Sequence, residues 1–321
     1  MTGKGKWRLL IAVIMCGILL AGCGSSGNTA AEEGGVKRNG TQQDSENDQE
    51  MVNTEPPEED LAERSASDPS ETSEETAIEL VQNEELEAVI RSVISAEEQR
   101  GTIVSAYTER LDTGEAVSVD SGPMQSASLI KLYIAACVYE HLEEMRSLEG
   151  YGNETEDLVK SMIAISDNNA ANVLVERLGG GNSAEGMKRV NVFCTDHGYT
   201  DTSMGRLMLD FSSTADNYTS VRDCGKFLRD VYQNSLAGAG EILQFLLEQE
   251  RTSKIPAGVP VDVRTANKTG ELDHVENDAA IIYAGSGAYV LCVMMNSLQD
   301  PAAGRAVITE LSAAIYEYME P

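Results

Sequence analysis

Basic residues and histidines are scarce in this chain of 321 residues. It has 24 lysines and arginines against 53 aspartates and glutamates, which gives a formal net charge of −29 at pH 7. This balance argues against a surface for DNA or RNA, because neutralising phosphates requires clustered lysine and arginine side chains. With only three histidines and scattered cysteines, the sequence offers no obvious metal-binding cluster. We therefore expect no nucleic-acid partner and no metal.

The chain also lacks repeats of fixed period, which argues against solenoids and propellers. Hydrophobic residues nevertheless make up 41% of it, too many for a wholly disordered protein. The length is sufficient for one large domain or two small ones.

Residues 1–23 resemble a bacterial export signal. Three basic residues among the first eight precede an apolar stretch at 9–20, which is shorter than the roughly 20 residues of a membrane-spanning helix. The stretch ends in Leu-Ala-Gly-Cys at 20–23, which resembles the bacterial lipoprotein box, so we expect Cys23 to be lipidated. An uncleaved anchor and a signal peptide with a chance cysteine are the alternatives. In each of these three cases the rest of the chain works outside the cytoplasm. Lipidation of Cys23 would place it on the cell membrane.

Residues 24–80 have the composition of a disordered tether. They are rich in small polar residues and contain 16 acidic but only 3 basic side chains. Such a segment buries too little apolar surface to offset the entropy of ordering it, and its charges repel one another. An acidic binding tail is the alternative. We expect the folded domain to occupy residues 81–321.

Helical and strand patterns alternate within residues 81–321. Periodicity predicts helices over 83–99, 128–142, 156–178, 184–198, 221–249 and 302–318, and strands over 102–111, 115–120, 261–268, 279–284 and 288–296. Strands from the two ends can pair, so we predict an α+β fold with a five-stranded antiparallel sheet, flanking helices and an inserted all-helical subdomain. A substrate cleft is expected where this subdomain meets the sheet.

A first candidate motif is Ser128-Leu-Ile-Lys131. On a helix, residues at i and i+3 share a face, so the Lys131 ammonium can reach the Ser128 hydroxyl. A serine hydroxyl is a poor nucleophile until a base removes its proton. On its own this pattern carries little weight, because chance produces about one per chain of this size.

A second motif is Ser166-Asp167-Asn168. The Ser166 hydroxyl can relay a proton to a leaving group, and the Asn168 amide offers a donor and an acceptor to a substrate amide. A helix N-cap is the alternative interpretation, because these residue types favour that position.

A third motif, Lys268-Thr269-Gly270, lies at the end of a predicted strand. Lys268 can attract a substrate carboxylate as a point charge, and Thr269 can donate a hydrogen bond to it. Gly270 would let a substrate approach the backbone closely. An ordinary exposed strand end is the alternative.

Together, and in this order, the three motifs resemble those of the penicillin-recognising serine hydrolases, most closely the class A β-lactamase family. The resemblance extends over about residues 83–320 and includes Ser-Ala-Ser at 126–128 and Asn-Asp at 277–278. It implies a small β-lactam or peptidoglycan-peptide-like substrate and requires no metal or organic cofactor. No feature specific to an oligomer is visible, so we expect a monomer.

The resemblance implies how covalent chemistry would proceed. Ser128 would attack the strained lactam carbonyl and form an acyl-enzyme. Lys131 would act as the base or as electrostatic support. Ser166, assisted by Lys268, would pass a proton to the lactam nitrogen.

The resemblance also implies how substrate would be held. Asn168 would bind the acyl side-chain amide, while Lys268 and Thr269 would bind the carboxylate that these drugs share with stem peptides. The oxyanion hole would use the backbone N–H groups of Ser128 and of Glu271, the residue after the third motif.

The sequence departs from the class A pattern in the loop after residue 200. Class A enzymes carry there a glutamate that positions the water releasing the acyl group. Arg206 stands where an arginine precedes that glutamate by two residues, which puts Met208 at the glutamate position. Met208 can neither accept a proton nor orient water; Asp210 and Asp216 are candidate substitutes. Without one, the acyl group would leave slowly or stay.

A second departure is spacing. Only 35 positions separate Lys131 from Ser166, fewer than is typical of class A enzymes. The missing residues belong to the helical subdomain and include a loop that often walls the cleft. We therefore expect a wider site.

The sequence leaves open whether the four cysteines of the domain are paired and what role His274 has. Cys137, Cys194, Cys224 and Cys292 either form disulfides, as an exported protein permits, or are buried thiols. His274 either contacts substrate or is a solvated turn residue.

Three functions fit the sequence. The leading one is a lipid-anchored serine hydrolase that opens β-lactams through Ser128 and releases the product at an uncertain rate. The first alternative is a penicillin-binding-protein-like enzyme that acts on D-Ala-D-Ala peptides or stays acylated. The second is a non-catalytic binding lipoprotein of the cell envelope.

Overall fold

The computed structural model describes residues 83–320. The expected export signal at 1–23, with Cys23, and the expected tether at 24–80 lie outside the described residues, and both stay predictions. Within 83–320, no helix has the length and apolar character needed to cross a membrane.

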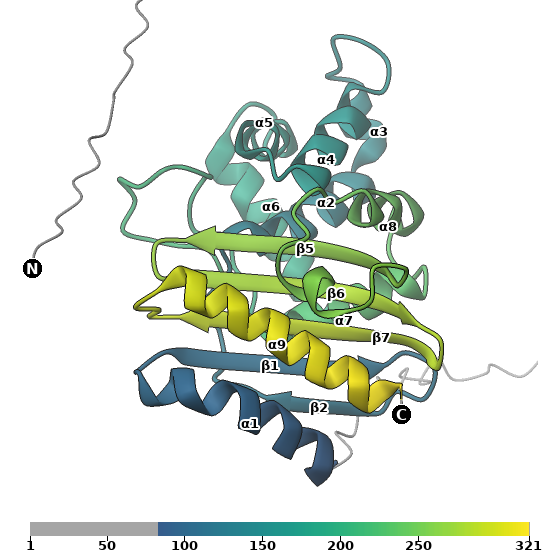
Figure 1. Cartoon of the computed structure of the whole chain (residues 1–321). Helices are drawn as coiled ribbons and strands as arrows, with labels where there is room; N and C mark the ends of the chain where they lie inside the picture. Colours follow the sequence, from purple (N-terminus) through teal and green to yellow (C-terminus); the bar gives the residue numbers. More distant parts are fainter. Residues whose placement is uncertain (1–82, 321) are drawn as a thin grey trace, which may run out of the picture. The chain divides into compact units, whose positions relative to one another are not determined.

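A five-stranded antiparallel sheet is the centre of the fold, in the order β2-β1-β7-β6-β5 (Figure 1). Its strands are β1 (Ile103–Arg110), β2 (Ala116–Val119), β5 (Arg264–Leu272), β6 (Val275–Ala284) and β7 (Gly287–Asn296). As predicted, the two ends of the chain pair: β1 runs along β7 from Ile103 opposite Asn296 to Arg110 opposite Tyr289. A second, two-stranded sheet joins β3 (Met124–Gln125) to β4 (Tyr218–Thr219).

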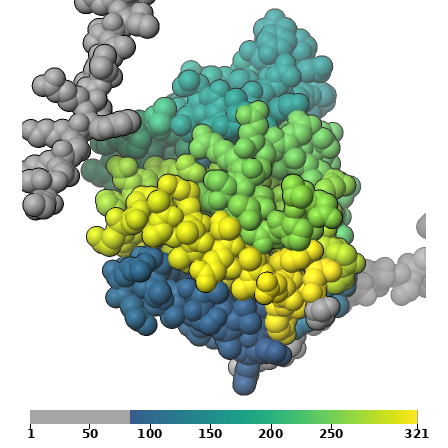
Figure 2. Space-filling model, viewed as in Figure 1, coloured from purple at the N-terminus to yellow at the C-terminus, as the bar shows by residue number. Residues whose placement is uncertain are grey.

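Helices cover both faces of the sheet. Figures 1 and 2 show α1 (Glu84–Gln99) and α9 (Pro301–Met319) side by side on one face. The helices associated with the other face and the helical subdomain are α2 (Ile130–Glu140), α3 (Leu142–Arg146), α4 (Glu154–Ala164), α5 (Asn168–Leu178), α6 (Ser183–Asp196), α7 (Val221–Tyr232) and α8 (Ala239–Leu247). Because strand side chains alternate in direction, the sheet contributes to two apolar clusters, one on each face. The α+β prediction is confirmed.

Two predicted helices are each divided in the structure. The helix expected over 156–178 is α4 followed by α5, because Ser166 adopts a left-handed conformation (φ 62°) and the Asp167 side chain caps the new helix. The helix expected over 221–249 is α7 followed by α8, with Asn234 (φ 56°) and Gly238 (φ 68°) in left-handed conformations between them. The helical periodicity on both sides hid these interruptions.

The third motif lies within a strand and not, as predicted, at its end. The strand expected over 261–268 is β5, which continues to Leu272 because it pairs with β6 up to the contact between Leu272 and Val275. Lys268 and Gly270 therefore lie inside a strand rather than at its end. His274 (φ 64°) occupies the tight turn between β5 and β6 and donates from Nδ1 to the Leu298 carbonyl (2.6 Å). It is thus a turn residue.

Cysteine chemistry is settled for the described domain. Cys137, Cys194, Cys224 and Cys292 are buried free thiols. Burial raises the pKa of the Cys137 thiol to about 12, so it carries no nucleophilic thiolate near neutral pH.

Candidate active site

The nucleophile turn is a short 3₁₀ segment, η1 (Ala127–Leu129), placed directly before α2. The prediction that Ser128 begins the helix itself is therefore wrong by one short turn. Ala127 has φ 47°, a conformation that costs about 1–3 kcal/mol and persists only where neighbouring contacts enforce it. Those contacts come from β6, where Asn277 Nδ2 donates to the carbonyls of Gln125 (2.9 Å) and Ser126 (3.2 Å).

Lys131 is fully buried on the first turn of α2 and points to the second motif. Its Nζ donates to the Ser166 carbonyl (2.7 Å), the Ser166 hydroxyl (3.1 Å) and Asn168 Oδ1 (2.8 Å). Burial, with a contribution from the charge of Arg251, lowers the pKa of Lys131 to about 7. Near neutral pH a large share of Lys131 is therefore neutral and able to accept a proton.

Lys268 approaches the same hydroxyl from the sheet. Its Nζ donates to Ser166 Oγ (2.9 Å) and to the Thr269 carbonyl (2.8 Å). Burial, followed by the charge of Lys131, lowers the pKa of Lys268 well below its ordinary value. Since Ser166 Oγ accepts from two amines, its own hydrogen is left to donate elsewhere. The second and third motifs thus meet at one oxygen atom.

Asn168 is the first residue of α5, and Asp167 caps that helix by accepting from the backbone N–H groups of Asn169 and Ala170. The N-cap interpretation therefore holds for Asp167 and is compatible with the chemical interpretation of its neighbours. Because Asn168 Oδ1 accepts from Lys131, its Nδ2 is the group oriented for a ligand carbonyl.

Gly270 has a different use from the one expected. A Cβ atom at this position would lie 2.8 Å from the Ser126 carbonyl and 3.2 Å from Ala127 Cβ. The absence of a side chain therefore lets β5 approach the nucleophile turn, rather than primarily admitting a substrate.

Replacing Gly270 with alanine should separate β5 from the nucleophile turn. We expect a loss of about 1–3 kcal/mol in the free energy of unfolding, measured by chemical denaturation, together with slower acylation of Ser128. Gly240→Ala is the matched control, because nothing lies within 4 Å of the added Cβ in helix α8. Equal stability of the two variants would contradict the contact.

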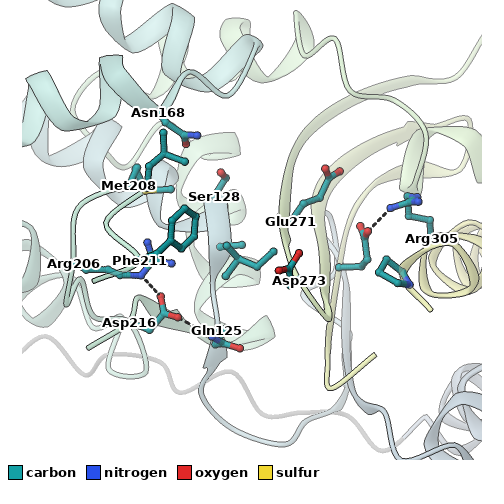
Figure 3. A pocket seen from close by; sticks show the side chains of 15 residues that line it. Gln125, Ser128, Asn168, Arg206, Met208, Phe211, Asp216, Glu271, Asp273 and Arg305 are labelled. Atoms are coloured by element: carbon teal, nitrogen blue, oxygen red, sulfur yellow. Dashed lines mark hydrogen bonds and ion pairs between the residues drawn. The ribbon is translucent and has the colours of Figure 1, made fainter. Parts of the chain in front are cut away.

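One cleft of about 620 Å³ is lined by three of the predicted site residues, Ser128, Asn168 and Glu271. In Figure 3, Ser128 lies between two walls: Arg206, Met208 and Phe211 form one, and Glu271, Asp273 and Arg305 form the other. The cleft lies where the helical subdomain meets the sheet, as predicted. Lys131, Ser166, Lys268 and Thr269 are buried and are not among the lining residues. Lys131 contacts the lining residue Asn168, and Lys268 contacts Ser166.

Met208 is the residue that the spacing predicts at the position of the class A glutamate. Asn172 fixes its backbone from both sides, because Oδ1 accepts from Met208 N (2.8 Å) and Nδ2 donates to Met208 O (3.0 Å). The side chain is 8% exposed and lines the cleft. The cleft is therefore lined at this point by a thioether, which cannot act as a proton acceptor.

Neither candidate substitute is free to act as a base. Asp216 accepts from Arg206 Nε (2.8 Å) and from Gln125 Nε2 (2.7 Å), so both carboxylate oxygens are engaged. Asp210 is exposed, is bonded to Ser212 and lies outside the cleft lining. The idea that either aspartate replaces the glutamate receives no support from this geometry.

Several site residues escaped the sequence analysis. Phe211 and Leu209 line the cleft while 72% and 56% exposed, and Arg206 stacks 5.6 Å from the Phe211 ring centroid. Exposed apolar side chains in a polar loop were the available signal. Arg305 of α9 gave no signal, because only the tertiary fold brings that helix to the cleft.

Across residues 83–320, no three or more histidine, cysteine, aspartate or glutamate side chains gather in a way that would hold a metal ion.

Solved structures with this architecture support the fold. The β-lactamase from Sphaerobacter thermophilus is 22% identical, with 73% of this chain and 97% of that chain covered and a TM-score of 0.63. A mutant of PBP-A, solved as its acyl-enzyme with penicillin G, is 24% identical over 74% and 97% of the two chains, with a TM-score of 0.64. The class A β-lactamase of the last common ancestor of Gram-negative bacteria is 22% identical over 72% and 99%, with a TM-score of 0.62.

Sequence comparison identifies the family directly. The chain matches no curated protein at a significant level. A sequence model described as the Beta-lactamase enzyme family matches residues 145–319, which include the second and third motifs but not the nucleophile turn. This match covers more than half of the chain, and the chain therefore belongs to the β-lactamase enzyme family.

Proposed function

We propose that the protein is a serine hydrolase that opens β-lactams through an acyl-enzyme on Ser128 and releases the acyl group slowly. The observation that carries the proposal is the chain of hydrogen bonds from Lys131 through Ser166 to Lys268, together with the partly exposed Ser128, which lies three residues before Lys131 and lines the cleft. It supplies a near-neutral amine as a base and a hydroxyl as a proton relay, which are the two groups that acyl transfer to nitrogen needs.

The proton balance follows from these contacts. Neutral Lys131 takes the Ser128 proton as Oγ attacks the lactam carbonyl. Ser166 then donates its hydrogen to the lactam nitrogen as the C–N bond breaks, and the Lys131 ammonium returns a proton to Ser166 across the 3.1 Å contact. The nitrogen ends protonated, Lys131 ends neutral and Ser128 ends as an ester.

The direction of β5 supports Glu271 as an oxyanion donor. The Thr269 carbonyl accepts from Lys268, so it points away from β6 toward that amine. In an extended strand the N–H and C=O of one residue point to the same side, and the side alternates along the strand. The N–H of Glu271, two residues on, then faces the same way as the Thr269 carbonyl, and with the Ser128 N–H it would hold the developing oxyanion.

Met208 is the reason we propose slow release. Hydrolysis of the ester needs a base that activates water, and Met208, Asp210 and Asp216 offer none at the usual position. The same feature favours a second candidate, a penicillin-binding-protein-like enzyme that processes D-Ala-D-Ala peptides. Release of D-alanine from such a peptide, absent in Ser128→Ala, would identify it.

The proposal is tested by labelling the purified protein with a fluorescent penicillin. We expect a covalent band that survives denaturation and is lost in Ser128→Ala. An unlabelled wild type would refute the proposal and favour the non-catalytic binding lipoprotein.

We also propose that the protein is monomeric and is anchored to the cell membrane through lipidated Cys23. Metabolic labelling with a fatty acid, lost in Cys23→Ala, tests the anchor.

A further inference from the structure

A fully buried lysine outside the motifs lies behind the third motif. Lys254 precedes the short helix η2 (Ile255–Gly258), and its carbonyl accepts from Thr309 Oγ1 of α9 (3.2 Å). It therefore sits on the α9 face of the sheet. Burying an ammonium costs free energy unless it is paired and hydrogen-bonded, so the contacts of Lys254 indicate which groups it stabilises.

The Lys254 ammonium joins the two strands of the β5–β6 hairpin. Its Nζ donates to the Asn277 carbonyl (3.0 Å) and the Gly270 carbonyl (3.3 Å). It forms ion pairs with Glu276 Oε2 (2.6 Å) and Glu271 Oε1 (3.2 Å). Two carbonyl acceptors and two carboxylates, one of each on each strand, thus surround one amine.

Two of these strand residues belong to the proposed machinery. Gly270 packs directly on the carbonyl of Ser126 in the nucleophile turn, and Glu271 is the proposed oxyanion donor. The position of Lys254 therefore fixes the part of β5 that sets the distance between the two oxyanion donors.

The negative charge of the Glu271 side chain is compensated by the ammonium of Lys254. A carboxylate on the residue that donates to the oxyanion opposes negative charge developing there. Burial raises the pKa of the Glu271 carboxyl, but Lys254 and then Arg251, whose Nη1 lies 3.4 Å from Oε2, outweigh it and leave the pKa below its ordinary value. The carboxylate stays ionised and needs its cationic partners.

We infer that Lys254 is a positioning residue for acylation, which neutralises the Glu271 carboxylate and holds the β5–β6 hairpin against the nucleophile turn. This inference rests on the proposed function, because it concerns the rate at which Ser128 is acylated.

The test compares two double variants that carry the same formal charge. The first variant, Lys254→Met with Glu271→Gln, removes the carboxylate of the residue whose N–H is the proposed oxyanion donor. The second variant, Lys254→Met with Glu276→Gln, removes the Glu276 carboxylate and leaves Glu271 paired with Arg251 alone. The remaining Glu276 of the first variant keeps its ion pair with Arg305. We expect the first variant to be acylated by a penicillin at least about tenfold faster than the second.

Each outcome bears on one claim. The expected rate difference supports the positioning role, because loss of stability would act in the opposite direction. The first variant keeps Glu276, which is 2% exposed, without Lys254, whereas the second keeps Glu271, which is 39% exposed. Equal acylation rates in the two variants would overturn it, as would a Lys254→Met single variant that is acylated at the wild-type rate. A wild type without a Ser128-dependent adduct would instead remove the proposed function itself.

Discussion

Replacing Met208 with glutamate is expected to raise the rate of deacylation about 10²–10⁴-fold, the range that a well-placed general base contributes. Asn172 holds the Met208 backbone through two hydrogen bonds that do not involve the side chain, so the loop keeps its path in the variant. The new carboxylate would enter the cleft that contains Ser128. Stopped-flow or mass measurements of acyl-enzyme decay give the rate.

Met208→Gln is the matched control, because it has the size and polarity of glutamate without a proton acceptor of comparable basicity. We expect its acyl-enzyme to persist like that of the wild type. Equally slow decay in the glutamate variant, with its fold intact, would show that Met208 does not limit release.

Replacing Lys131 with methionine should lower the acylation rate about 10²–10⁴-fold, because the variant keeps the volume of the side chain but loses the base. The effect has a pH signature in the wild type. With a pKa of about 7, Lys131 is neutral above that pH and protonated below it, so acylation should rise through pH 7 and then level off.

Lys160→Met is the control for the loss of a lysine, since this side chain is 52% exposed in α4 and pairs with Glu248. It should acylate at the wild-type rate. A Lys131→Met variant that acylates normally, or a wild-type profile flat across pH 7, would contradict the role of Lys131 as the base.

Local sequence patterns predicted most of the fold. Runs of residues typical of strands predicted all five strands of the main sheet, and the positions of those strands at both ends of the domain predicted their pairing. The breaks at Ser166 and Gly238 were harder, because a single left-handed residue leaves the periodicity on both sides intact. The start of β6 was likewise predicted too late. It includes the polar residue Asn277, which is buried by strand pairing and by a hydrogen bond to the Gln125 carbonyl that only the fold supplies.

The site divides in the same way. Lys131 of the first motif and Lys268 of the third converge on Ser166 of the second, because each lies at a defined place on a helix or strand. Partners of charged groups were not predictable: the sequence offers Asp216 as a base, and only the fold shows that Arg206 and Gln125 already occupy it. Lys254 lacks any sequence signal, since its two carbonyl acceptors and two carboxylate partners come together only in the β5–β6 hairpin.

The most direct test is intact-mass spectrometry of the purified protein with penicillin G, followed from seconds to hours beside Ser128→Ala. We predict that the wild type gains the mass of one intact penicillin, that the adduct persists after free drug is removed, and that the alanine variant gains nothing. An adduct that clears as fast as it forms would contradict slow release and require a water-activating base other than Asp210 or Asp216. No Ser128-dependent adduct at all would contradict the proposed chemistry as a whole.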